Sequence, residues 1–355
     1  MIAEVGRYAL INAKLRARIS KILSDDFFSS LIKCHTLGEM LNFLRPTSFG
    51  DLAPVYEQTG DLKSVEMALY RREAGLFREL EPSLPAAVLP VVRAFAAGYE
   101  IENLKNALRL FFDHTYRKRI IDDSVHYLMR ERVLHEIPFE TIINGSTLDE
   151  VAQSLAATPY GDTIRNSIAD VDRLQSLFPL SAALDRYYYR QLTDVISTLD
   201  TRDKIVALRL VGIEIDLQNI SWIIRFRTFY NLPYEAMLTL IIPGGFTVKG
   251  STLQDIYRSQ HMSDDLEAMI RKNYPGIAAL IGSPSADQPS RLTTIERILE
   301  RITLEEVRRI MRGYPFTIGI ILAYFILKRL EIRRIRTVLN AGFFNISKER
   351  TAALL

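Results

Sequence analysis

Apolar residues recur at steps of three and four along most of this 355-residue chain. This spacing places them on one face of an α-helix, because a helix completes a turn every 3.6 residues. Alternation at every second residue, which is typical of a half-buried strand, is scarce, and its best example is the short run Phe246-Thr247-Val248. The sequence therefore predicts an all-α fold. The clearest helical stripes are Val5-Tyr8-Asn12-Leu15-Ile19-Ile22, Ala97-Ile101-Leu104-Leu108-Phe111, Ile213-Leu217-Ile220-Ile224 and Ile332-Ile335-Leu339.

One helix pattern occurs three times. The run Glu100 to Leu104 is matched by Asp216 to Ile220, and again by Glu331 to Ile335, where Arg334 stands in the place of an asparagine. The N-terminal helix carries a weaker copy that lacks the acid. An asparagine beside an apolar stripe must be hydrogen-bonded when it is buried, so we expect these amides to fix helix register. The repeated polar positions are Asn12, Asn103 and Asn219, together with Arg18, Arg109 and Arg225.

A second pattern follows three of these copies in the same order: the weaker N-terminal copy, the copy at Glu100 and the copy at Asp216. It is a threonine followed three residues later by an acid, which predicts a capping box at the start of a helix. The threonine oxygen accepts a backbone N–H in the first turn, and the acid reaches back to the residue before the helix. A similar run, Thr303-Leu304-Glu305-Glu306, falls outside the repeat, so the motif alone is not specific. The repeated pairs are Thr36 with Glu39, Thr147 with Glu150, and Thr252 with Asp255.

These two patterns together predict an internal triplication. We expect the repeats to span residues 1–92, 93–206 and 207–355, the last including closing C-terminal helices. A period above one hundred residues is too long for a solenoid of helix pairs. The sequence instead predicts three pseudo-symmetric helical bundles that form a funnel around a central socket, closed by the last helix and the first.

Four segments carry a resemblance to a known family. They are Asn12 with Lys14, Arg16 and Arg18; Tyr99 to Lys105; the helix-ending turn Leu240 to Phe246; and Tyr324 to Asn340. In this order they resemble the C subunit of the V-type and A-type rotary ATPases, called the d subunit in eukaryotes. The resemblance spans nearly the whole chain, although no single segment is specific. It departs from the family where the acid before Asn12 is missing and at Arg334.

The resemblance implies a non-catalytic central-stalk subunit. In that family, a funnel-shaped adaptor sits on the cytoplasmic face of the membrane ring of proteolipid c subunits and holds the end of the central shaft in its socket. Torque then passes between the ATPase head and the ring during proton or sodium transport. The implied partners are the shaft subunits and the c-ring, and the implied location is cytoplasmic, peripheral on the membrane through the complex.

Composition agrees with such a role and argues against others. The formal net charge is only +3, which does not suggest a nucleic-acid binder. From Arg291 onward, 13 basic residues face 6 acidic ones, so this end carries +7 and could meet an acidic partner or anionic lipid. The most apolar run, Phe316 to Leu327, is shorter than the roughly 20 residues that a bilayer requires. No signal peptide is visible, and the single cysteine, Cys34, suggests a reducing compartment.

The sequence offers no catalytic centre. Its five histidines do not pair at metal-ligand spacing, and it contains no nucleophile elbow or dinucleotide-binding glycine motif. We therefore expect no catalytic, cofactor-binding or metal-binding residues. Two alternatives stay open: a helical scaffold in an unrelated complex, and an enzyme whose site is assembled from distant residues. Four arginines on the last long helix could contact the shaft or the ring, or could form a solvated face: Arg329, Arg333, Arg334 and Arg336.

Overall fold

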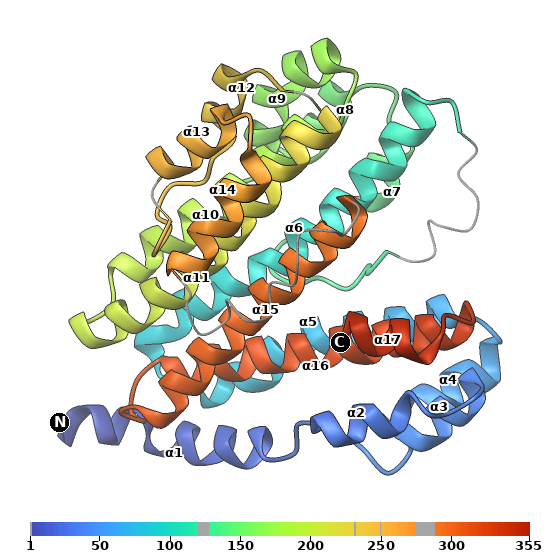
Figure 1. Cartoon of the computed structure of the whole chain (residues 1–355), viewed down its shortest axis with the longest axis vertical. Coiled ribbons are helices and arrows are strands. Elements are labelled where there is room, and N and C mark those ends of the chain that lie inside the picture. Colours follow the sequence, from blue (N-terminus) through green and yellow to red (C-terminus); the bar gives the residue numbers. More distant parts are fainter. Residues whose placement is uncertain (1, 120–127, 231, 249, 274–287) are drawn as a thin grey trace. The chain divides into compact units, whose positions relative to one another are not determined.

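Every regular element in the described part of the chain is a helix (Figure 1). A computed structural model describes residues 2–119, 128–230, 232–248, 250–273 and 288–355. The all-α prediction is confirmed, and Phe246 to Val248 lies in a turn segment between two helices.

The chain divides into two compact units. Unit 1 contains residues 1–12 and 186–323, and unit 2 contains residues 13–185 and 324–355. Each boundary falls inside a helix, so three helices contribute residues to both units: α1 (Ile2–Ile19), α10 (Phe178–Ser197) and α16 (Gly319–Phe343).

Unit 2 buries an apolar core that residues from both ends of the sequence build together. Phe28 and Leu44 from the first 60 residues pack in one cluster with Ile332, Ile335 and Leu339 of α16, and all five are almost fully buried. In Figure 1 this part of α16 (orange-red) lies along α2 to α4 (blue). The other helices of unit 2 are α2 (Asp25–Leu31), α3 (Leu37–Leu44), α4 (Leu52–Thr59), α5 (Leu62–Leu80), the 3₁₀ turns Glu81–Ser83 and Ala86–Val88, α6 (Leu89–Thr115), α7 (Phe139–Ile143), α8 (Leu148–Ser154), α9 (Gly161–Leu174) and α17 (Lys348–Leu354).

Stacked aromatic rings join α5, α6 and α16 inside unit 2. The ring of Phe325 stacks on Phe77 with centroids 4.2 Å apart, and on Phe95 with centroids 6.2 Å apart. Phe325 and Phe95 are at most 1% exposed. Such rings each bury a large apolar surface, so these contacts fix the N-terminal part of α16 against two helices that come much earlier in the chain.

Unit 1 is built around α11, which packs against α15 and α13. An ion pair between Arg209 of α11 and Glu306 of α15, 2.6 Å apart, lies at that contact. The remaining elements are α11 (Thr201–Arg225), a π-helical turn (Phe226–Tyr230), α12 (Tyr234–Leu240), α13 (Gly250–Arg258), α14 (Met262–Asn273) and α15 (Gln288–Arg312).

Candidate functional site

Three buried carboxylates stand at the repeated acid positions. Glu100, Asp216 and Glu331 are 2%, 0% and 2% exposed. Each accepts backbone N–H groups from a loop: Glu100 from residues 134 and 135 at 2.8 and 2.7 Å, Asp216 from residues 247 and 248 at 2.6 and 3.2 Å, and Glu331 from Leu23 at 2.8 Å. A charged acceptor makes such hydrogen bonds stronger than those between neutral groups. Each carboxylate therefore fixes a loop to its helix.

The loop that Glu331 holds comes from the opposite end of the sequence. Leu23 directly precedes Ser24, the N-cap residue of α2, and lies 308 residues from Glu331. The other Glu331 oxygen accepts the Lys328 ammonium at 2.6 Å. The first helix lacks the repeated acid, and the last long helix supplies the carboxylate for the loop before the first capping box.

Two repeated asparagines bind loops in the same manner, one turn further along their helices. The Asn103 amide donates to the Met129 carbonyl at 2.6 Å and accepts the Met129 N–H at 3.1 Å. Asn219 makes the same reciprocal pair with Ile242, at 2.8 and 2.9 Å. Both amides are almost fully buried, and each satisfies a donor and an acceptor of the loop. Asn12, at the weaker copy, is only half-buried.

In the third copy, an ion pair occupies the asparagine position. Arg334 lies 2.8 Å from Asp25, and its guanidinium stacks over the Phe28 ring at 4.1 Å. A guanidinium reaches farther than an amide, so this position contacts the side chains of α2 instead of the loop backbone.

The predicted helix-ending turn brings a glycine against Asp216. A Cβ built on Gly245 would lie 2.1 Å from the Asp216 Oδ1 atom, which is far inside contact distance. Gly244, next to it, has a φ of +95°, a backbone conformation that favours glycine. These two glycines let the loop approach close enough for its N–H groups to reach the buried carboxylate.

Two of the three predicted capping boxes are present. Thr36 accepts the Glu39 N–H and Thr147 accepts the Glu150 N–H, both at 3.2 Å. Each acid reaches back to the N–H of the residue before its threonine, at 2.8 and 2.7 Å. The local sequence is sufficient to predict these two helix starts.

The third predicted capping box is wrong as a helix start. Helix α13 begins at Gly250, so Thr252 and Asp255 lie inside the helix instead of at its cap. The N–H groups of Thr247 and Val248, in the segment before α13, are bound to Asp216. The helix therefore starts before the position that the local motif predicts.

The three repeated arginines do not share one type of contact. Arg18 is half-buried and pairs with Glu79 at 2.5 Å, whereas Arg109 is exposed and donates to the Asn106 amide at 2.9 Å. Arg225 is exposed at the end of α11.

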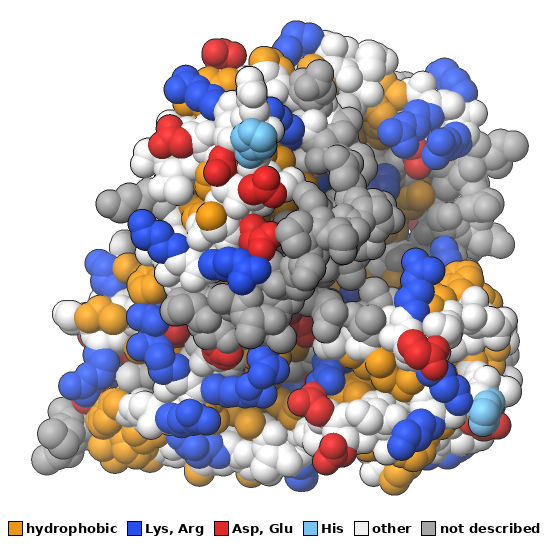
Figure 2. Space-filling model, viewed as in Figure 1, with side chains coloured by type: hydrophobic (Ala, Val, Ile, Leu, Met, Phe, Trp, Pro, Cys, Tyr) orange, Lys and Arg blue, Asp and Glu red, His pale blue; other side chains and the backbone are white. Residues whose placement is uncertain are grey.

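The four arginines of α16 divide into two kinds. Arg329 lies 3.7 Å from Glu73 and over the Phe95 ring, and Arg334 pairs with Asp25, so contacts inside unit 2 occupy both. Arg333 and Arg336 are exposed. On the face drawn in Figure 2, basic and acidic side chains are interspersed over α2 to α4. A partner interface at these arginines stays a prediction, and Arg333 and Arg336 are the more exposed pair.

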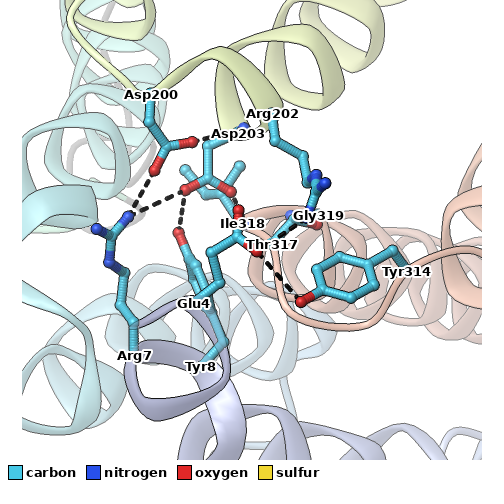
Figure 3. Close-up of polar contacts among 10 residues, drawn as sticks. All are labelled: Glu4, Arg7, Tyr8, Asp200, Arg202, Asp203, Tyr314, Thr317, Ile318 and Gly319. Carbon is cyan, nitrogen blue, oxygen red and sulfur yellow. Dashed lines mark hydrogen bonds and ion pairs between the residues drawn. The ribbon is translucent and has the colours of Figure 1, made fainter. Parts of the chain in front are cut away.

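A polar network that the sequence reasoning missed fixes the first turns of α1 within unit 1. Tyr8, fully buried, donates to Asp203 at 2.5 Å, and the other Asp203 oxygen accepts the Ile318 N–H at 2.7 Å (Figure 3). Arg7 lies 2.6 Å from Asp200 and 3.7 Å from Asp203. Asp203 thus connects α1, the start of α11 and the turn before α16.

The sequence signal for this network was weak. Asp200 and Asp203 occupy cap and first-turn positions of α11, where acids are common for local reasons. Nothing local indicates that the second acid points into the protein. A second contact group lies beside it, in which Glu4 accepts from Arg202 at 2.8 Å and from the Tyr314 hydroxyl at 3.2 Å.

The surroundings shift the pKa values of the two aspartates of this network in opposite directions. Burial raises the pKa of Asp203 above its ordinary value, since hydrogen bonds from Tyr8 and the Ile318 N–H offset only part of the cost of burying the charge. Burial also acts to raise the pKa of Asp200, but the Asp203 N–H and Arg7 outweigh it and hold that pKa below its ordinary value. Opposite charges on Arg7 and the two aspartates therefore help to hold the start of α1 within unit 1.

The described ranges contain no cluster of three or more histidine, cysteine or acidic residues placed to hold a metal ion. Among those same residues, no helix is both long and apolar enough to cross a bilayer. The strongly bound carboxylates and amides all serve backbone or side-chain contacts within their own unit.

The profile of the ATP synthase (C/AC39) subunit family matches residues 11–354. The chain belongs to this family. Similar proteins include the C subunit of the A-type ATP synthase of Methanocaldococcus jannaschii, which is 23% identical over 100% of this chain and 88% of its own length. The corresponding C subunit of Thermococcus onnurineus is 24% identical over 98% of this chain and 90% of its own length, and that of Methanosphaera stadtmanae is 23% identical over 95% and 84%.

Membership of the C/AC39 family makes the chain a non-catalytic subunit of a rotary ATPase. The resemblance seen in the four sequence segments is thereby confirmed. The buried polar residues of this family member are accordingly interpreted as structural.

Proposed function

We propose that the chain is the central-stalk subunit that couples the central shaft of a V/A-type ATPase to the membrane c-ring during proton or sodium transport. The observation that carries the proposal is the family match over almost the whole chain, together with relatives named as the C subunit of A-type ATP synthases that align along most of their own length. The chain would then be cytoplasmic and peripheral, bound to the membrane through the proteolipid ring. It would contact no nucleic acid.

The internal contacts suit a part that transmits torque. Loops that are hydrogen-bonded to buried carboxylates resist displacement, because moving them would leave a buried charge without donors. Close-packed helices add low compressibility. An unrelated scaffold has no comparable observation in its favour.

We also propose the threefold arrangement of repeats over residues 1–92, 93–206 and 207–355 around a socket for the shaft. Carboxylate contacts recur at Glu100, Asp216 and Glu331, and asparagine contacts recur at Asn103 and Asn219. This spacing of about 115 residues supports the repetition of one helix unit along the chain. The contact of Glu331 with the loop at Leu23 supports closure of the ring by the last long helix.

The test uses the intact complex. The tagged full chain is purified from membranes, and we expect shaft subunits and the proteolipid to accompany it. Membranes stripped of the chain should hydrolyse ATP without driving ion uptake, and adding the chain back should restore uptake. A Glu102→Gln chain, altered at an exposed side chain of α6, serves as the control that should restore uptake equally. Uptake that persists without the chain would refute the coupling role.

A further inference from the structure

A cavity of about 490 Å³ lies in unit 2 between α5, α6 and α16. Its volume is within the range of pockets that hold small molecules. Three basic side chains reach its lining from three helices: Lys63, Arg109 and Arg336.

Among the described residues of the lining, the positive charge is only partly balanced. The single acid among them is Glu66, and one of its oxygens accepts the Asn340 amide at 2.6 Å. Among the residues that the structure describes, no carboxylate lies within 4.0 Å of the guanidinium of Arg109 or Arg336. On the same helix as Arg336, both Arg329 and Arg334 do have such a partner.

The chemistry of the lining determines the kind of ligand that would fit. Two guanidiniums and one ammonium favour an anion with two or more charges, and the planar guanidinium matches phosphate oxygens with paired N–H donors. The Asn106 amide lies beside Arg109, and Leu110 and Leu128 form an apolar wall of the same cavity. Such a wall could cover an uncharged part of the ligand.

We propose that this cavity binds a small molecule that carries two or more linked phosphates, held by Arg109 and Arg336. The partly enclosed volume and the convergence of cations from α5, α6 and α16 favour a compact polyanion over an extended acidic protein segment. This binding goes beyond the coupling role and requires only the isolated chain.

Titration calorimetry of the full chain with ATP, ADP and pyrophosphate tests the proposal at low and moderate salt. We expect binding by at least one of these probes, and at least tenfold weaker binding after Arg109→Gln or Arg336→Gln. Arg225→Gln is the matched control, since it changes the same repeat position outside the cavity and should alter affinity less than twofold. Thermal unfolding monitored by circular dichroism checks that each variant is folded.

The comparison of probes separates two sources of affinity. Pyrophosphate binding as tight as that of ATP places the affinity in the phosphates alone, and tighter ATP binding adds the apolar wall; both outcomes support the proposal. Absence of binding by all three probes overturns it, as does equal weakening in Arg225→Gln. Binding of an acidic peptide without binding of any phosphate probe also overturns it, in favour of a protein partner.

Discussion

Replacing Glu100 tests whether a buried carboxylate holds its loop. One Glu100 oxygen accepts the N–H groups of Leu134 and His135. The other oxygen accepts the Tyr160 hydroxyl at 2.7 Å and lies 2.7 Å from Nδ1 of His135. Glu100→Ala removes the acceptor for two backbone donors and one hydroxyl. An orphaned buried donor costs about 1–3 kcal/mol. The His135 side chain is 37% exposed, so water can relieve part of this cost.

We therefore expect Glu100→Ala to lower the free energy of unfolding by about 3–5 kcal/mol. Glu100→Gln keeps one acceptor oxygen but loses the charge and turns an NH₂ group towards the donors, so we expect about 2–3 kcal/mol. Urea unfolding followed by circular dichroism measures both values. Hydrogen exchange of a peptide covering residues 128–139 should show faster exchange in both variants.

Glu102→Gln is the matched control on the same helix. Glu102 is exposed and pairs at 2.9 Å with Lys105, a mostly buried side chain that also pairs with Asp185 at 2.9 Å. Glu102→Gln leaves the Lys105–Asp185 pair in place, so we expect it to cost about 1 kcal/mol or less. A Glu100→Ala protein that loses less than about 1 kcal/mol, or whose residues 128–139 exchange as in the unaltered chain, would contradict the reasoning.

Three further predictions concern other parts of the chain. Tyr8→Phe should cost about 1.5–3 kcal/mol of unfolding free energy, and Asp203→Asn should cost less in the Tyr8→Phe background than alone, as a double-mutant cycle measures. Burial by itself would raise the pKa of Glu306, but hydrogen bonds from two arginines hold it below its ordinary value, so the stability it contributes is present above that value and lost as the pH falls through its folded pKa. The difference in stability between the unaltered chain and Glu306→Gln should therefore shrink on acid titration, and a constant difference would contradict this. Leu44→Ala, at a fully buried position, should cost about 2–5 kcal/mol, whereas Leu10→Ala, at a side chain 77% exposed, should cost less than about 0.5 kcal/mol.

The sequence by itself determined the features that depend on neighbours within about four residues. Helical stripes predict helices because the apolar face repeats with each turn, and Thr36 and Thr147 predict caps because donor and acceptor lie in the same turn. Recurrence of the Asn103 pattern at Asn219 predicted that the two amides share a role. It could not predict the loop residues they bind, which depend on where each loop returns to its helix.

Only the tertiary structure decided the contacts between distant segments. Leu23 meets Glu331, and Tyr8 meets Asp203, across 308 and 195 residues of chain. At Thr252 the helix has already begun, earlier than the local helix-start motif predicts, and Asp216 binds the segment before it. A local motif contributes about 1 kcal/mol, whereas a buried carboxylate left without its donors costs several. Because the contacts of the buried carboxylate contribute the larger energy and exist only in the packed chain, the final position of such segments is set when the helices pack together.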